Sequence, residues 1–97
     1  MELRGLDRLP HHMRDGVERY VLYGVPGGSF LTELFANRLV QAFGRADDEN
    51  IAAMRDWAAW LYNHAPRGCW GSHKAVAEWC EAGGLLGMAP ASNGAQR

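Results

Sequence analysis

Histidine and cysteine are the side chains of this sequence that could support metal binding or nucleophilic catalysis. His64, Cys69, His73 and Cys80 fall within one short stretch of the chain. Zinc ligands usually come in closely spaced pairs, and these intervals match no common pattern. Nucleophilic catalysis would need Cys69 or Ser72 beside a histidine base held by a third group, and the sequence indicates no such set. We therefore expect no catalytic residue, no metal and no cofactor, and interpret the chain as non-enzymatic.

A glycine-rich turn over residues 24–29 is a second candidate site. Backbone N–H groups at the start of a helix bind phosphate, so Gly27, Gly28 and Ser29 would form a site for an anionic nucleotide. The turn lacks the spacing and the lysine of a P-loop, and no predicted strand precedes it. A tight connection between two helices is the simpler interpretation, with Gly24 ending one helix and Ser29 capping the next.

Exposed aromatic and arginine side chains are the candidates for a protein contact. Trp60 projects off the apolar stripe of its helix, and Tyr23 projects off the stripe of the first helix. Lys74 is the single lysine among ten basic residues, and arginine suits interfaces because its guanidinium makes paired contacts. We predict Tyr23, Arg38 and Trp60 as partner-interface residues. Burial of Trp60 by neighbouring helices remains an equal alternative, and self-association through Trp60 and Tyr23 is compatible with either.

Four predicted helices position these residues. The first helix is expected from Leu9-Pro10 to Gly24 and the second over residues 30–43. The third is expected from its N-cap Asp47 to Pro66. The fourth is expected over residues 73–82, with Ser72 as its N-cap and Gly83-Gly84 as its end. The third carries apolar residues spaced by three and four, which predicts a buried stripe that Trp57 widens: Ile51, Met54, Ala58, Leu61 and Ala65.

These patterns predict an all-α fold, a compact bundle of four helices with the third helix central. Ninety-seven residues with 47% hydrophobic content are enough for one domain. We expect a short N-terminal arm over residues 1–8, a helical domain over 9–86 and a disordered C-terminal tail over 87–97.

Charge and hydropathy limit the partners. A formal net charge of -1 gives no overall attraction to nucleic acid, and a recognition helix over 73–82 would offer Lys74 against Glu78 and Glu81. No apolar run reaches the roughly 20 residues that span a bilayer, and no signal peptide pattern is present. We therefore expect no membrane association and a cytoplasmic location.

A combined pattern of residues runs through the predicted domain. It comprises Leu9, Pro10, His12, Met13, Arg14 and Gly16; Arg19 and Tyr20; Gly24, Pro26, Gly28, Phe30 and Leu31; Ala42, Phe43, Arg45, Ala46 and Asp47; Leu61, Tyr62, Asn63, Ala65 and Pro66; Trp70, Gly71 and Ser72; and Trp79, Gly83 and Gly84. Over residues 9–85 the chain resembles a family of small uncharacterised proteins encoded by tailed phages and prophages of proteobacteria. The resemblance implies a phage accessory protein and carries over no catalytic or ligand residue.

These observations lead to one functional expectation and two alternatives. We expect an accessory protein in the bacterial cytoplasm that binds a host or phage protein, for example as an inhibitor or modulator of a host or anti-phage defence factor. The first alternative is a helical module that binds an anionic nucleotide at Gly27, Gly28 and Ser29. The second is DNA or RNA binding, which would weaken steeply with salt. A homo-oligomer is compatible with all three.

Overall fold

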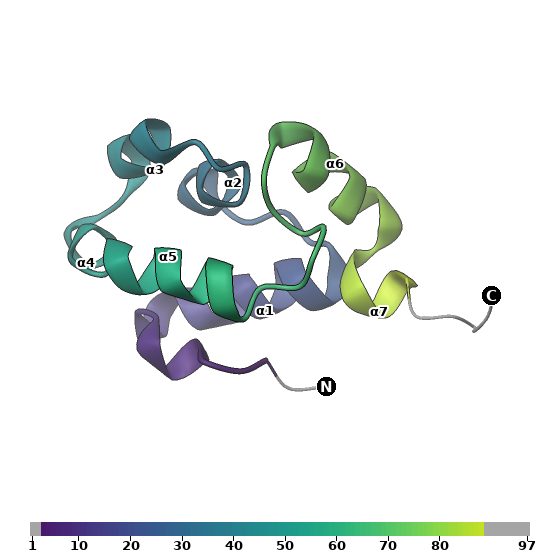
Figure 1. The fold of residues 1–97 in the computed structure, drawn as a ribbon, viewed down its shortest axis with the longest axis horizontal. Helices are drawn as coiled ribbons and strands as arrows, with labels where there is room; N and C mark the ends of the chain where they lie inside the picture. Colours follow the sequence, from purple (N-terminus) through teal and green to yellow (C-terminus); the bar gives the residue numbers. More distant parts are fainter. Residues whose placement is uncertain (1–2, 89–97) are drawn as a thin grey trace.

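The computed structural model describes residues 3–88, and this part of the chain is all-α, as predicted (Figure 1). Two 3-10 turns and seven α-helices follow one another, and no strand occurs among the described residues. They are η1 (Leu6–Arg8), η2 (His11–Met13), α1 (Arg14–Tyr23), α2 (Ser29–Phe35), α3 (Leu39–Arg45), α4 (Asp48–Ala52), α5 (Met54–Asn63), α6 (His73–Ala82) and α7 (Gly84–Met88).

The predicted bundle of four helices is wrong in its detail, because two predicted helices are divided and α7 is added. The second predicted helix is interrupted between α2 and α3, where Asn37 adopts a left-handed conformation with φ 63°. The Arg38 N–H donates to Glu33 O and the Asn37 N–H to Leu34 O, the hydrogen bonds of a Schellman helix end. Asparagine tolerates this conformation better than most residues, which explains why the chain turns there. The third predicted helix is divided at Ala53 into α4 and α5.

The predicted helix caps are confirmed where they depend on local chemistry. Asp47 accepts a hydrogen bond from the Asn50 N–H, and Ser72 accepts one from the Ala75 N–H. Gly24 and Gly83 end α1 and α6 in the left-handed conformation that glycine adopts without strain. Ser29 differs from the prediction, because it is the first residue of α2 and the preceding Gly28 occupies the cap position without a side-chain hydrogen bond.

Aromatic side chains join the helices through the core. Tyr20 of α1 stacks on Phe35 of α2 with ring centroids 4.3 Å apart, and Phe30 meets Trp57 of α5 edge to face at 5.4 Å. The Trp79 indole N–H of α6 donates to the carbonyls of Tyr20 and Val21, at 3.1 and 3.2 Å. Those carbonyls lie in the last turn of α1, where a helix has carbonyls without an intrahelical partner, and Tyr20 O also accepts the Gly24 N–H. The indole therefore fixes α6 against the end of α1.

The segment over residues 3–8, predicted as part of an arm, belongs to the folded unit. Leu3 and Leu6 pack against the core, and η1 lies beside α5. The Trp60 indole N–H donates to Arg4 O at 2.8 Å. Gly5 is required here, since a Cβ would lie 2.7 Å from the His64 ring. At the other end, α7 includes Gly87 and Met88, so the first two residues of the predicted tail are helical, and residues 89–97 lie outside the described part.

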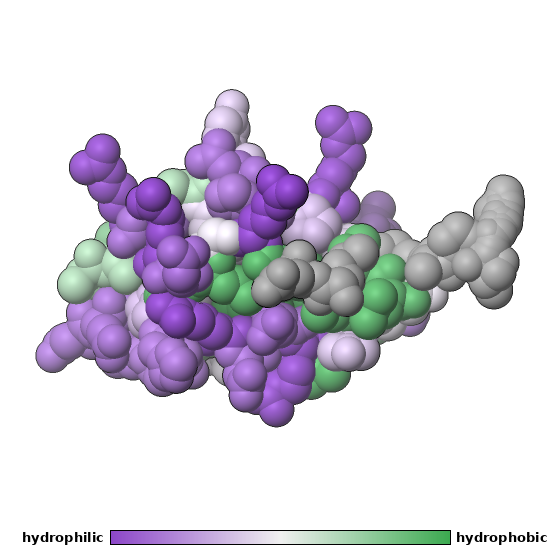
Figure 2. Space-filling model, turned by 90° about the horizontal axis from the view of Figure 1, so that it is seen from below, coloured by the Kyte–Doolittle hydropathy of each residue, from purple (hydrophilic) through white to green (hydrophobic). Residues whose placement is uncertain are grey.

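The surface on the side of the N-terminal segment is mostly hydrophilic (Figure 2). A band of hydrophobic residues lies between the hydrophilic ones and reaches the end of the molecule that carries α7. Within residues 3–88, no helix has both the length and the apolar character needed to cross a membrane.

Candidate functional site

An apolar groove lies between α2, α3 and α5, with a volume of about 250 Å³. Its lining is apolar apart from two side chains at the turn between α2 and α3, Asn37 and Arg38. The apolar lining residues are Leu34, Leu39, Ala42, Met54, Ala58, Leu61, Tyr62 and Trp70. Such a concave apolar surface with few polar groups is the usual form of a binding site.

Exposed apolar side chains continue from the groove onto the outer surface. Leu39 is 62% exposed and Tyr62 is 83% exposed, although both line the groove. Val40 and Phe43 are also exposed, and together with Leu39 they form what we call the α3 ridge. Several large apolar side chains exposed at and beside a groove mark an interaction site more often than scattered single residues do.

The groove exists because α5 carries apolar residues on more than one face. The sequence predicts Ile51, Met54, Ala58, Leu61 and Ala65 as a buried stripe, and this prediction is only partly correct. Ile51 belongs to α4, and Ala65, which follows α5, is partly buried against the core. Trp57 faces the core with no exposed surface, and Leu61 is buried, but Ile51 is 44% exposed and Ala58 is also exposed. Bulky tryptophans fill the core side of α5, and Met54, Ala58 and Leu61 therefore line the open groove.

Arg38 connects the groove to a small charged cluster. Its Nη1 donates to His73 Nε2 at 3.0 Å, and the same His73 nitrogen lies 3.2 Å from Glu33 Oε1. Glu33 Oε1 is buried, and Arg38 Nε lies 3.7 Å from it. The cluster holds Arg38 at the groove.

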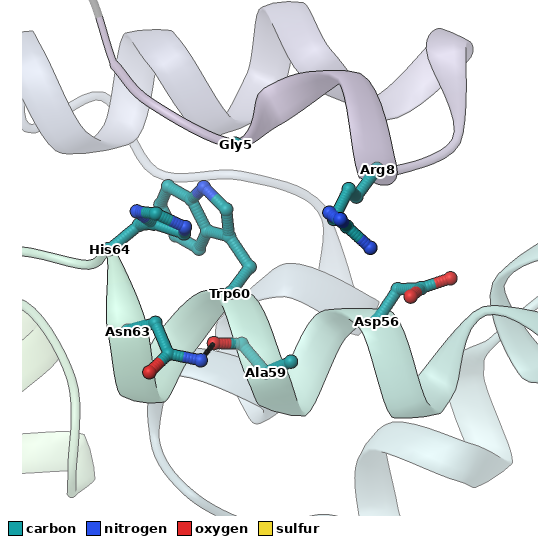
Figure 3. Close-up of a pocket in the computed structure, with 7 residues that line it drawn as sticks. All are labelled: Gly5, Arg8, Asp56, Ala59, Trp60, Asn63 and His64. Atoms are coloured by element: carbon teal, nitrogen blue, oxygen red, sulfur yellow. Dashed lines mark hydrogen bonds between the residues drawn. The ribbon is translucent and has the colours of Figure 1, made fainter.

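A second, polar cleft of about 280 Å³ lies between the N-terminal segment and α5 (Figure 3). Arg8 extends from η1, while Asp56, Asn63 and His64 come from α5 and its end. The Asn63 amide is held by a hydrogen bond to Ala59 O. The cleft contains one guanidinium, one carboxylate and one imidazole. Their arrangement does not indicate a catalytic role for any of them.

The predicted interface residues lie on three separate parts of the surface. Trp60 borders the polar cleft but is only 2% exposed, so the prediction of a ring free for a partner is wrong, and the N-terminal segment is what covers it. Arg38 is exposed and lines the apolar groove. Tyr23 is 56% exposed on α1, beside Asp15 and Arg19. The structure therefore brings none of the three together.

The predicted anion site lies at the start of a short helix. Gly28 is exposed and precedes α2, while Gly27 is half-buried against Leu31. A shallow hollow of about 520 Å³ adjoins both glycines, with Arg19 and Asp15 on its border. Ser29 makes no capping hydrogen bond and is exposed. The opposite charges at the border give an anion no clear preference for this hollow.

The histidines and cysteines do not assemble into a reactive centre. Among residues 3–88, no three His, Cys, Asp or Glu side chains are grouped as metal ligands would be. Cys69 is buried, and burial raises the pKa of its thiol to about 12, so it remains protonated and unreactive at neutral pH. The Tyr20 hydroxyl donates to Cys69 O, and burial raises the pKa of Tyr20 as well.

Sequence reasoning missed the groove and most of its rim. The exposure of Leu39 could have been predicted only together with the break at Asn37, because that break turns α3 away from the direction of α2, whereas Tyr62 lies on α5. In the sequence, the only indication of this break is Asn37, followed by Arg38. Comparison of the chain with protein-family models, with curated proteins and with solved structures finds no match.

Proposed function

We propose that this chain is a non-enzymatic accessory protein that binds another protein through the apolar groove. The observation that carries the proposal is the exposure of Leu39 and Tyr62, 62% and 83%, at the edges of an apolar concavity. Leaving large apolar side chains in water costs about 25 cal/mol per Å² of apolar surface, which a partner covering them would recover. Binding of a partner would therefore explain why apolar side chains occupy these exposed positions.

The form of the groove fits a protein partner better than a small polar ligand. Aromatic side chains at Tyr62 and Trp70 border it, and aromatic residues dominate the energetics of protein interfaces. Arg38 supplies a charged group at one end, which can orient a partner without entering the apolar part. The expected result is a small interface centred on a few apolar contacts.

The biological setting of the proposal comes from the resemblance of residues 9–85 to proteins of tailed phages and prophages. We propose a phage or prophage accessory protein that acts in the bacterial cytoplasm. Its target would be a host or phage protein, such as a host or anti-phage defence factor that it inhibits or modulates. The fold supports this setting only in being small, all-α and provided with an open apolar surface.

Affinity purification from lysogenic or infected cells tests the proposal. The tagged protein is compared with the variant Leu39→Ser/Tyr62→Ser, whose changes lie at exposed positions and should leave the fold intact. The matched control is Leu86→Ser/Tyr23→Ser, which removes the same side-chain types from exposed positions outside the groove. We expect a stoichiometric partner that is retained by the control and lost from the groove variant. Equal recovery by both variants would contradict the assignment of the groove.

The alternative functions remain predictions with less support. A nucleotide at Gly27, Gly28 and Ser29 would meet Asp15 as well as Arg19 at the adjoining hollow. A thermal-shift panel of nucleotides checks this site, and no change in melting temperature is expected. DNA or RNA binding is tested by measuring the affinity at increasing salt concentration. If contacts to phosphates dominate, the affinity must fall steeply as the salt concentration rises.

A further inference from the structure

We infer that the groove accepts an amphipathic α-helix whose apolar face is flanked by carboxylates. The inference rests on the proposed function and specifies the chemistry of the partner. Two properties of the described residues lead to it, namely the helical construction of the groove and the sign of the charges around it.

The construction of the groove favours a helix as its occupant. Its sides are formed by the side chains of α2, α3 and α5, whose backbone groups are already used within the helices. An extended peptide binds by adding backbone hydrogen bonds to a free strand edge, and this groove presents none. A helix instead needs only a channel for apolar side chains spaced by three and four residues. Leu34, Met54 and Leu61 supply such a channel.

The charged groups around the groove are mainly arginines. Arg38 is the charged residue of the lining. Arg45 follows it at a spacing of seven on the same side of α3 as Ala42, and Arg55 lies three residues before Ala58 on α5. Both are exposed.

No acidic side chain is among the residues that line the groove, and Asp56 of α5 lines the polar cleft instead. Glu33 is mostly buried and already faces Arg38 and His73. Asp48 is exposed in the first turn of α4. Arginine pairs with carboxylate through two parallel hydrogen bonds, so carboxylates beside the apolar face of a partner helix would find matching donors here.

The same charges argue against a second copy of this chain as the occupant. Two copies that met groove to groove would bring Arg38, Arg45 and Arg55 toward their own counterparts. Like charges across an interface are unfavourable. We therefore expect the isolated protein to be monomeric.

Nuclear magnetic resonance titration with two synthetic peptides tests the inference. Both peptides carry the same leucines at helical spacing, with glutamate at the remaining charged positions of one and lysine in the other. The ¹⁵N-labelled full-length protein should show shifts at the Leu39 and Tyr62 amides and at the Trp70 indole with the acidic peptide. At low salt we expect it to bind about tenfold or more tightly than the basic peptide.

Charge-reversal variants provide the control. Arg38→Glu/Arg55→Glu should reverse the preference toward the basic peptide, whereas Arg19→Glu/Arg67→Glu should leave it unchanged, because those exposed arginines do not line the groove. Equal affinity for the two peptides, shifts confined to another surface, or a dimer in light scattering would overturn the inference.

The two experiments separate the inference from the proposed function. Loss of a cellular partner from Leu39→Ser/Tyr62→Ser, combined with no preference for the acidic peptide, would retain the function and reject the acidic helix. Binding of the acidic peptide at the groove, combined with a cellular partner that both variants retain, would support the inference on binding chemistry and reject the proposed use of the groove in cells.

Discussion

Trp79 shows how one polar atom of a large side chain can determine the position of two helices. Its indole N–H is shared between the carbonyls of Tyr20 and Val21, and the ring itself is buried. Both acceptors belong to the last turn of α1. Tyr20 O also accepts the Gly24 N–H, so removal of the indole donor would take this partner mainly from Val21 O. An unsatisfied buried group costs about 1–3 kcal/mol.

The variant Trp79→Phe tests this interaction. We expect its free energy of unfolding to fall by about 1–3 kcal/mol from the lost hydrogen bond, with a further loss from the smaller ring. Urea denaturation followed by circular dichroism measures the change. Trp70→Phe is the matched control, since Trp70 is half-buried and no hydrogen bond from its indole occurs among the described residues. Similar losses in both variants would mean that ring volume, rather than the hydrogen bond, determines the effect.

Asp47 links the N-terminal part of the chain to the start of α4. Its carboxylate accepts from the Asn50 N–H at 2.8 Å, and His12 Nε2 lies 3.0 Å from its other oxygen. These hydrogen bonds, led by that of Asn50, lower the pKa of Asp47 below its ordinary value of 3.8. A lowered folded-state pKa contributes stability that is complete above the unfolded pKa and is lost as the pH falls through the folded pKa.

Replacement of Asp47 by asparagine should therefore reduce the sensitivity of the fold to acid. Asparagine is an equally good N-cap but carries no ionisable group, so the variant keeps the cap and loses the pH dependence. Unfolding free energies of Asp47→Asn and the natural protein, measured from pH 7 down to pH 3, should differ in slope below about pH 4. The same slope in Asp47→Asn and the natural protein would contradict this role of Asp47.

At the scale of elements, α1 and α7 pack with their backbones in close contact. Gly84 has φ 73°, and a Cβ on it would overlap the backbone nitrogen of Gly24. Gly84→Ala should lower the free energy of unfolding by more than about 2 kcal/mol, from left-handed strain and the steric conflict together.

Gly44→Ala in α3 should raise the free energy of unfolding by about 0.5–1 kcal/mol, because a Cβ there meets no other atom and alanine favours a helix. Thermal unfolding of both variants gives the comparison, and a loss of stability in Gly44→Ala would contradict the description of α3.

Helix ends could be predicted from the sequence because their chemistry is local. Asp47 and Ser72 each satisfy a backbone N–H three residues ahead, and Gly24 and Gly83 supply left-handed conformations whatever the rest of the chain does. The orientation of α5 could not be predicted in this way. Its apolar residues cover too much of the cylinder for periodicity to choose one face, and the choice depends on which helices supply space for Trp57 and Trp60.

The same distinction applies to the candidate site. Arg38 was identified from its residue type, and the structure places it at the groove. Trp60 was identified from its position off the stripe, but the N-terminal segment covers it, and short segments without periodicity leave no signal of where they pack. The groove depends on the corner at Asn37 and on α5, which are distant in the sequence. A surface built from separate elements is therefore the part least accessible to sequence reasoning.

At the scale of the whole molecule, the N-terminal segment completes the fold by covering α5. Leu3 and Leu6 pack against the core, and the carbonyl of Arg4 accepts the Trp60 indole N–H. A chain that begins at Leu9 would leave this indole without its acceptor and expose part of its ring. Exposure of roughly 100 Å² of apolar surface corresponds to a loss of about 2–3 kcal/mol in the free energy of unfolding.

Hydrogen exchange of the indole N–H groups measures this effect at a single residue. In the full-length protein, the Trp60 indole and the Trp57 indole, which donates to Asn50 Oδ1 at 3.1 Å, should both exchange slowly. In the chain that begins at Leu9, the Trp60 indole should exchange at least about tenfold faster, since local opening controls its protection, while Trp57 changes only by the general loss of stability. If Trp60 remained as protected as Trp57, the N-terminal segment would not be what buries it, and residues 9–86 would form a domain without an essential arm.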